Sequence, residues 1–275
     1  MTLLAIPQPY DFVRSTERFQ AFGRDAATVV RDGALHRVVG GREVRIEPVP
    51  GGVRVRPGGG AVLGHVAVLL GLPFDLEAFW RWAREDAVFA ALEAGLPGYR
   101  PPLQPDPWEA LVTSITAQQV SLHAAFAIRS RLIERFGEKH DVAWAFPTRE
   151  RVARLREEEL LAVGFSRRKA EYLIGLARLE LDLGALANLA DDEVVAAITA
   201  VRGLGRWSAD WFLARVLGRG AAWPAGDLAV RKAVSRFYGN GLPLTELEVR
   251  AVGERFGEHA NLAAHMLLAG ARITG

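Results

Sequence analysis

The sequence contains no cysteine. This absence excludes disulfide bonds, iron–sulfur clusters and zinc sites built on thiolates, because each of them requires cysteine sulfur. It also fits a reducing compartment, in which structural disulfides are rare. Redox chemistry on a cluster and a disulfide-stapled fold are therefore not expected.

The sequence also lacks a long uninterrupted apolar run and a large excess of charge of either sign. The longest apolar stretch, residues 61–72, contains His65 and glycines and is too short to span a bilayer. The opening residues, Met1–Pro7, lack the basic flank and the length of a secretory signal. The 34 basic and 32 acidic side chains nearly balance, so a basic binding surface would have to arise from clustering. We expect a cytoplasmic protein with no membrane association, lying at the nucleoid if the source is bacterial.

The chain has enough apolar residues for a sizeable core, since 50% of its 275 residues are hydrophobic. Short alternating runs at 35–39, 43–47 and 51–57, separated by glycines, are typical of half-buried strands. Phenylalanines at helical spacing favour a helix over 12–24. The sequence therefore predicts a small α+β domain with an antiparallel sheet over residues 1–74.

From residue 75 onwards the pattern is helical. We expect residues 75–275 to form a mainly α domain that is divided into two helical subdomains flanking a cleft. The expected helices cover 76–94, 108–136, 149–162, 166–181, 192–200, 206–217, 227–238 and 246 to the end. A proline-rich stretch between the first two predicts a stiff linker.

A Gly-x-Gly turn joins two of these helices. Gly203 and Gly205 allow a tight turn whose backbone N–H groups lie at the positive end of the following helix, which suits a phosphate. The polar neighbours Arg202, Arg206 and Ser208 favour this interpretation. A plain structural corner between two helices is the alternative. Taken alone, the turn does not decide between them.

An acid follows at the start of a later helix, in Pro224-Ala225-Gly226-Asp227. Aspartate is a favoured helix N-cap, so Asp227 can be explained as a cap alone. The two roles are compatible, however. A carboxylate held ionised at a helix N-terminus can also stabilise a developing cation.

Two tryptophans lie four residues apart on the helix that leaves the turn. Trp207 and Trp211 therefore share one helix face. Packing in the core is the simpler interpretation. Flat aromatic surfaces beside a backbone phosphate site would also stack on an extruded base.

These residues resemble the helix-hairpin-helix DNA glycosylase superfamily, and in particular its 3-methyladenine DNA glycosylase II (AlkA) family. Two further segments are similar to the family pattern. Thr116–Ser121 resembles its Gln-Gln-x-Ser helix, and Gly164–Leu173 resembles the segment before the hairpin. The order of an α+β unit and a helical bundle also agrees, so the resemblance covers most of the chain.

The resemblance implies a role for each matching residue. Asp227 matches the catalytic aspartate, and Trp207 and Trp211 match aromatic positions that line the base pocket. Gly203 and Gly205 match the DNA-gripping hairpin. The implied partner is double-stranded DNA carrying alkylated bases, and we expect a monomer. No organic cofactor and no side-chain metal site are implied, although the family hairpin holds a sodium or potassium ion through backbone carbonyls.

Other matches concern the DNA surface. Gln118 and Gln119 fall where the family places residues that probe the gap left by a flipped nucleotide. Arg206 and Ser208 belong to the hairpin and are expected to contact DNA. Further backbone contacts are expected from scattered basic side chains, namely Arg167, Arg168, Lys169 and Arg231.

Two positions depart from patterns within the superfamily. Members that also cut the DNA backbone carry a Schiff-base lysine where this chain has Trp207, so the resemblance implies a monofunctional enzyme that leaves an abasic site. His259 stands where a pocket aromatic is common, and we expect it to line a wider base pocket. Two alternatives remain open: a non-enzymatic helix-hairpin-helix module that binds damaged DNA, and a bifunctional glycosylase/lyase.

Overall fold

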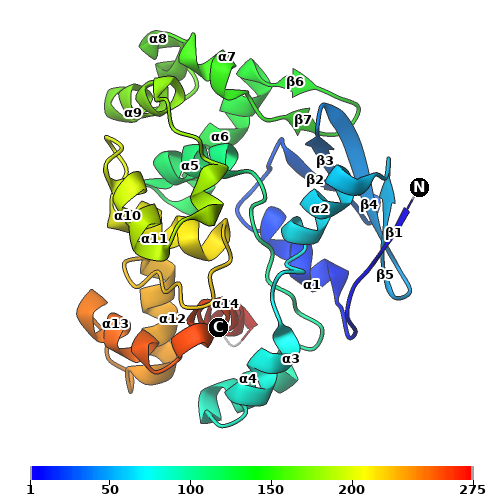
Figure 1. Ribbon diagram of the computed structural model, residues 1–275, viewed down its shortest axis with the longest axis vertical. Coiled ribbons are helices and arrows are strands. Elements are labelled where there is room, and N and C mark those ends of the chain that lie inside the picture. Colours follow the sequence, from blue (N-terminus) through cyan, green and yellow to red (C-terminus); the bar gives the residue numbers. More distant parts are fainter. Residues whose placement is uncertain (1, 274–275) are drawn as a thin grey trace.

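The computed structural model describes residues 2–273 and places a small antiparallel sheet beside a larger helical body (Figure 1). The sheet has the strand order β1-β5-β4-β3-β2. Its strands are β1 (Thr2–Ala5), β2 (Thr28–Arg31), β3 (Ala34–Val39), β4 (Arg42–Val49) and β5 (Gly52–Arg56). The predicted fold class, mainly α with an N-terminal antiparallel sheet, is confirmed.

The sheet is larger than the sequence indicated. The predicted strands correspond to β3, β4 and β5, whereas β1 and β2 were not predicted. In β4 the buried Val44 and Ile46 flank the half-buried Arg45, which is the expected alternation. Helix α2 (Gly60–Leu69) was also missed, and its Val66 and Leu69 are buried in the sheet core. The predicted helix over 12–24 shortens to α1 (Phe12–Thr16) and the 3₁₀ turn η1 (Glu17–Phe19).

In the remainder of the described chain, the regular structure is helical apart from a short hairpin of β6 (Glu138–Lys139) and β7 (Trp144–Ala145). Its helices are α3 (Leu76–Ala83), α4 (Ala87–Gly95), α5 (Pro107–Ala117), α6 (Leu122–Phe136), α7 (Arg149–Ala153), α8 (Glu157–Leu161), α9 (Arg167–Arg178), α10 (Asp191–Thr199), α11 (Arg206–Arg215), α12 (Leu228–Tyr238), α13 (Glu246–Glu254) and α14 (Ala260–Ile273). Within residues 2–273, no helix is long and apolar enough to cross a membrane.

Four predicted helices are wrong in extent, because each is divided into shorter ones. The last of them, from 246 to the end, divides into α13 and α14. Asp86 caps α4 by accepting from the backbone of Val88, which breaks the predicted helix 76–94. Ser121 caps α6 in the same way and breaks the predicted helix 108–136. The predicted helix 149–162 divides between α7 and α8. The spacing of apolar residues continues from one short helix into the next, so in the sequence only the capping residues indicate where one helix ends and another begins.

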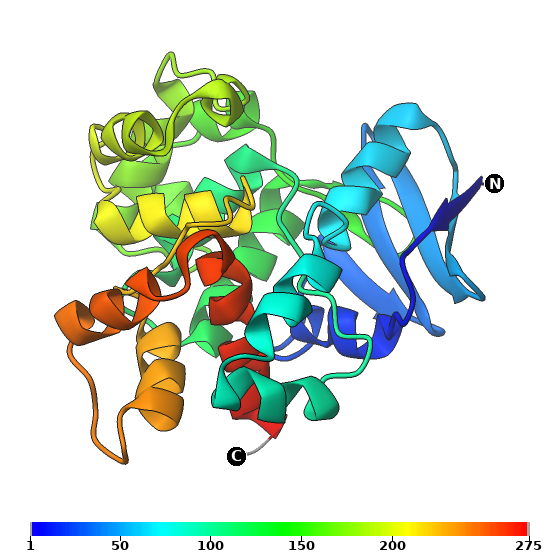
Figure 2. The same ribbon diagram turned by 60° about the horizontal axis from the view of Figure 1, so that its bottom comes forward.

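The helical body contains two hydrophobic cores. One gathers buried residues of α5 to α11, including Leu111, Leu173 and Phe212. The other gathers α3, α4, α12, α13 and α14, with Phe89 and Met266 near its centre. Figure 2 shows α14 (red) beside α3 and α4 (cyan to teal). The division of the chain into domains 1–74 and 75–275 stays a prediction.

A buried ionic network joins the sheet to the helical body. Glu109 of α5 accepts hydrogen bonds from both Arg37 of β3 and Arg129 of α6, and Arg129 also bonds Asp25. Gln104 donates to Glu109 at 3.0 Å. Burial raises the pKa of Glu109, but the two guanidinium groups outweigh this and hold the pKa below its ordinary value. The carboxylate therefore stays ionised inside the protein and couples its two parts.

Candidate active site

A turn that contains Gly203 and Gly205 connects α10 to α11, and the two glycines have different structural roles. Gly203 adopts φ +91°, and a Cβ there would lie 2.2 Å from the ring of Tyr172, so both backbone and packing require glycine. A Cβ added at Gly205 would have no neighbouring atom within 4 Å, and the residue is exposed. The first glycine therefore shapes the turn, and the second leaves the surface open to close approach.

The N-terminus of α11 lies at this open surface. Gly205 caps the helix without a side-chain hydrogen bond, so the N–H groups of the first turn stay available. Arg206 at the first helical position is largely exposed, and its Nε donates to Asp210 at 2.7 Å. Backbone donors together with the positive end of the helix dipole form a suitable site for a phosphate.

Asp227 makes two kinds of contact, one with each carboxylate oxygen. Its Oδ1 accepts from the backbone N–H groups of Ala229 and Val230 at 2.9 and 3.1 Å and so caps α12. Its Oδ2 accepts from the indole Nε1 of Trp207 at 3.2 Å. The cap alone does not explain Asp227, because its second oxygen meets a tryptophan from a different helix.

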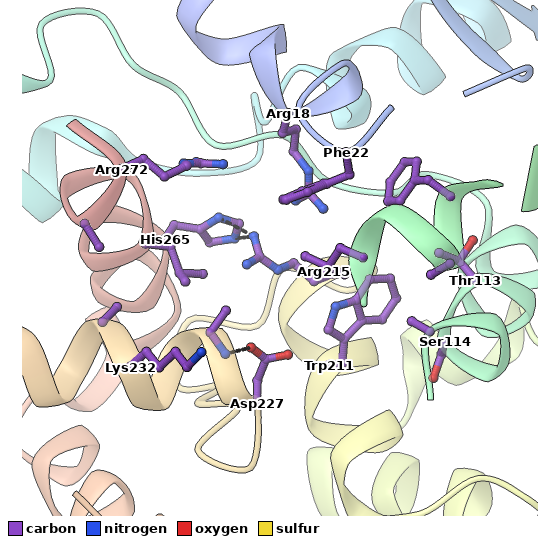
Figure 3. Close-up of a pocket in the computed structure, with 18 of the residues that line it drawn as sticks. Arg18, Phe22, Thr113, Ser114, Trp211, Arg215, Asp227, Lys232, His265 and Arg272 are labelled. Carbon is purple, nitrogen blue, oxygen red and sulfur yellow. Dashed lines mark hydrogen bonds between the residues drawn. The ribbon is translucent and has the colours of Figure 1, made fainter. Parts of the chain in front are cut away.

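A cavity of about 550 Å³ opens beside Asp227. Trp207 and Trp211 of α11 and Asp227 line it together, as the family resemblance implied. Figure 3 shows Asp227 below the cavity and the Trp211 ring along one side. Phe22 and Arg18 of the N-terminal part close the cavity from above (Figure 3). A carboxylate and two indoles around one cavity, next to a turn with available backbone N–H groups, could accommodate an extruded nucleotide.

Comparison with known proteins agrees with this geometry. The sequence profile of the family described as "HhH-GPD superfamily base excision DNA repair protein" matches residues 112–256, which is more than half of the chain. The chain belongs to this family. The matched range begins in α5 and ends after α13, so it includes the hairpin, the tryptophans and Asp227.

Named relatives in this superfamily are similar over different lengths. The chain is 30% identical over 164 residues to a DNA-3-methyladenine glycosylase of Bacillus subtilis, covering 57% of this chain and 54% of the relative. It is 31% identical over 260 residues to a probable bifunctional transcriptional activator/DNA repair enzyme AlkA of Mycobacterium tuberculosis, covering 84% and 50%. The chain thus spans about half the length of the curated relatives it matches.

A solved structure matches over nearly the whole chain. It is a 3-methyladenine DNA glycosylase from Archaeoglobus fulgidus, with a TM-score of 0.90, 28% identity, and coverage of 99% of this chain and 98% of the other. The structural similarity therefore extends beyond the matched family segment and includes the N-terminal sheet.

Two residues predicted to bind DNA have other roles in this helix-hairpin-helix protein. Ser208 is 1% exposed and its hydroxyl bonds that of Ser114 at 3.0 Å, so the prediction that it contacts DNA is wrong. The half-buried Gln118 donates from Nε2 to the carbonyl of Gly203 at 2.8 Å. Gln118 therefore stabilises the hairpin through this hydrogen bond. Gln119 is exposed with φ +54° between α5 and α6, and its contact with a DNA gap stays a prediction.

The basic side chains expected at the DNA surface are partly engaged within the protein. Lys169 donates to the carbonyl of Thr116 at 2.8 Å and so joins α9 to α5. Arg168 bonds the hydroxyl of Tyr172. Arg231 is half-buried, with a long 3.4 Å contact to the Leu244 carbonyl. Arg167 is exposed.

His259 does not line the cavity, so that prediction is wrong. It belongs to a 3₁₀ turn, η3 (Gly257–His259), that precedes α14. Its ring lies against Trp82, with centroids 4.7 Å apart, and against Phe79. His259 therefore packs in an aromatic cluster with Phe79 and Trp82 and directly precedes α14, which begins at Ala260. The wider pocket inferred from His259 loses its basis.

The cavity also contains residues that the sequence analysis missed. Arg215 follows Trp211 by four residues on α11, so the shared helix face could have indicated it. His265 is 2% exposed on the apolar helix α14, where a titratable residue among apolar ones was the available signal. Arg18 and Phe22 come from a distant part of the chain. Only the tertiary structure brings those two to the cavity.

The two polar residues at the back of the cavity affect each other electrostatically. Nη1 of Arg215 lies 3.0 Å from Nε2 of His265 (Figure 3). Burial, followed by the charge of nearby Arg18, lowers the pKa of Arg215 to about 9. Burial and then Arg215 lower the pKa of His265 well below its ordinary value. At neutral pH the arginine is charged and the imidazole is neutral.

Proposed function

We propose that this protein is a monofunctional DNA glycosylase that flips alkylated bases, such as 3-methyladenine, out of duplex DNA and excises them. The product is an abasic site, as in base excision repair. The observation that carries the proposal is the placement of Asp227, whose carboxylate bonds the indole of Trp207 and lines a cavity together with Trp207 and Trp211, beside the glycine hairpin. The names of the relatives and of the solved structure support the same activity.

The chemistry follows from the charge of an alkylated purine. Alkylation at a ring nitrogen makes the base a good leaving group, so the protein need not protonate it. The base enters the cavity and stacks on the indole rings, while Asp227 faces the sugar. As the glycosidic bond breaks, the carboxylate stabilises positive charge on the sugar, and water completes the hydrolysis.

Binding to DNA is expected to depend on the backbone rather than on sequence. The open N-terminus of α11 and exposed cations such as Arg206 and Arg167 contact phosphates, which releases counterions. We predict that affinity for undamaged duplexes falls steeply as salt rises and varies little with base sequence. Fluorescence anisotropy on two unrelated duplexes at several salt concentrations measures both properties. An affinity independent of salt would contradict this mode of binding.

The activity should stop at the abasic site. The lyases of this superfamily carry their amine on the helix that leaves the hairpin, where this chain has Trp207. Lys232 is an amine that lines the cavity, but it comes from α12 rather than from the helix that leaves the hairpin, and it is exposed. We predict that borohydride reduction with abasic DNA traps no covalent adduct. An adduct that disappears in a Lys232→Met variant would show a bifunctional glycosylase/lyase instead.

Two further features stay proposals. The hairpin can hold a sodium or potassium ion through its backbone carbonyls. The carbonyl of Gly203 keeps a second lone pair beside its bond from Gln118, so the residues fit such an ion, which would rigidify the turn. In the part of the chain that is described, no group of His, Asp or Glu side chains could hold a metal. A cofactor-free monomer acting on alkylated double-stranded DNA is the proposed functional form.

A further inference from the structure

Helix α11 contributes to a second cavity besides the one beside Asp227. Arg206 and Asp210 line this second cavity, which has a volume of about 500 Å³, whereas Trp207 and other residues of α11 line the first. Arg250 of α13 lines the second cavity as well. The chemistry proposed above uses neither Asp210 nor Arg250, although Arg206 stands at the open end of the hairpin.

Asp210 is a buried carboxylate that lies between two arginines. Its side chain is 6% exposed, and its Oδ1 accepts from Nε of Arg206 at 2.7 Å. Its Oδ2 lies 3.6 Å from Nη2 of Arg250 and has no hydrogen-bond partner among the described residues. A buried carboxylate with so few hydrogen bonds is costly unless nearby positive charge compensates it. Asp210 therefore depends on both arginines and holds both in place.

The hydrogen bond from Nε determines how Arg206 can meet DNA. The side chain of Arg206 is 60% exposed, and within residues 2–273 its two terminal nitrogens have no hydrogen-bond partner. A guanidinium group that is anchored through Nε presents its terminal nitrogens as a fixed pair of donors, which suits the oxygens of a phosphate. Asp210 therefore orients the phosphate contact that we propose at the hairpin.

Arg250 continues the line of charges toward Asp227. Its Nη2 donates to Oε1 of Glu246 at 2.9 Å. Glu246 is the first residue of α13, which packs beside α12 (Figure 1). The other carboxylate oxygen of Glu246 lies 3.4 Å from the point that a Cβ on Gly226 would occupy. The carboxylate therefore packs against the residue that directly precedes Asp227.

We propose that an ionic relay of alternating charge positions Asp227 relative to the DNA phosphate held at the hairpin. The relay consists of Arg206, Asp210, Arg250 and Glu246. Asp210 and Glu246 are positioning residues, because they act through their neighbours and not on the substrate. This role rests on the proposed glycosylase activity. Binding energy from the phosphate contact places the sugar of the flipped nucleotide against the carboxylate, where a misplacement of about 1 Å can slow a reaction about 100-fold.

The main test is a Glu246→Gln variant, which removes the charge and keeps the shape of the side chain. Release of 7-methylguanine from a duplex, measured with saturating protein in a single turnover, should slow about tenfold. Affinity for an undamaged duplex, measured by anisotropy, should stay equal or become tighter, because the variant removes a negative charge from a DNA-binding protein. Asp210→Asn should behave in the same way. A phosphate contact would instead lose affinity.

A second variant tests the link to the hairpin. Arg206→Met should weaken duplex binding and reduce the slope of log affinity against log salt by about 0.9, as for one lost phosphate contact. In the Arg206→Met background, Glu246→Gln should slow release by less than about twofold, because the contact that the relay serves is already gone. An equal slowing by Glu246→Gln in both backgrounds would overturn the relay.

The controls separate the relay from fold stability and from the glycosylase activity itself. Glu254→Gln makes the same change on α13, at an exposed residue with no ion pair among the described residues, and should leave the rate unchanged. The urea midpoint of Glu246→Gln should stay near wild type, because Glu246 is 53% exposed.

Three results would contradict the relay. A wild-type rate in Glu246→Gln would overturn it and leave the glycosylase assignment intact. Slower release together with weaker DNA binding in Glu246→Gln would indicate a general loss of the DNA surface and would also overturn the relay alone. Absence of release by the wild-type protein would overturn both the relay and the proposed function.

Discussion

An Asp227→Asn variant is expected to lose base excision while it keeps DNA binding. Asparagine still caps α12, because its amide oxygen can accept from the backbone of Ala229 and Val230 as Oδ1 does. The negative charge that opposes the sugar cation is lost, however. We expect the single-turnover rate on 7-methylguanine duplexes to fall by about 10³-fold, as when other preorganised electrostatic groups are removed. Affinity for the same duplex, measured by anisotropy, should change little.

A matched control uses another aspartate that caps a helix. Asp75 accepts from the backbone of Ala78 at 2.9 Å at the start of α3 and does not line the cavity. Asp75→Asn should therefore leave excision unchanged. If Asp227→Asn kept near wild-type excision, the catalytic role would be wrong and Asp227 would act only as the N-cap of α12.

Removing the carboxylate of Glu109 is expected to cause the largest loss of stability. Glu109→Ala leaves the guanidinium groups of Arg37 and Arg129 buried with less compensation, at the joint between sheet and helices. Breaking a buried pair from one side costs about 3–5 kcal/mol. We expect the free energy of unfolding in urea to fall by this amount, with both parts of the protein destabilised together.

An exposed ion pair serves as the comparison. Glu77 and Arg81 are paired at 2.9 Å on α3, with 87% and 71% of their side chains exposed. Glu77→Gln should leave the urea midpoint essentially where it is, because solvent screens such pairs. A Glu109→Ala protein as stable as Glu77→Gln would show that the buried network does not hold the two parts together.

Much of the site was open to prediction because its central residues are close in sequence or carry strong local signals. Trp207 and Trp211 share a helix face, and Asp227 is a residue type typical of a helix N-cap. Their meeting at one cavity came from the family resemblance, since no local pattern relates Asp227 to a helix that begins at Arg206. Arg18 could not be predicted, because its position depends on how the N-terminal part packs on the helices.

The errors have a common physical origin. Apolar spacing predicted continuous helices where Asp86 and Ser121 cap new ones, because burial continues across a break that only a short polar residue marks. His259 and Ser208 were assigned by their place in a motif. The packing differs from the motif for both residues: the ring of His259 lies against Trp82, and Ser208 is buried between α5 and α11.

The most direct test of the account is one glycosylase assay. A duplex with a single 7-methylguanine is incubated with excess wild-type protein, and half of each sample is heated in alkali. The account predicts release of free 7-methylguanine, with strand breaks that form only after alkali. Tight binding of the duplex without release of the base would contradict it, and would identify the protein as a DNA-binding module without enzymatic activity.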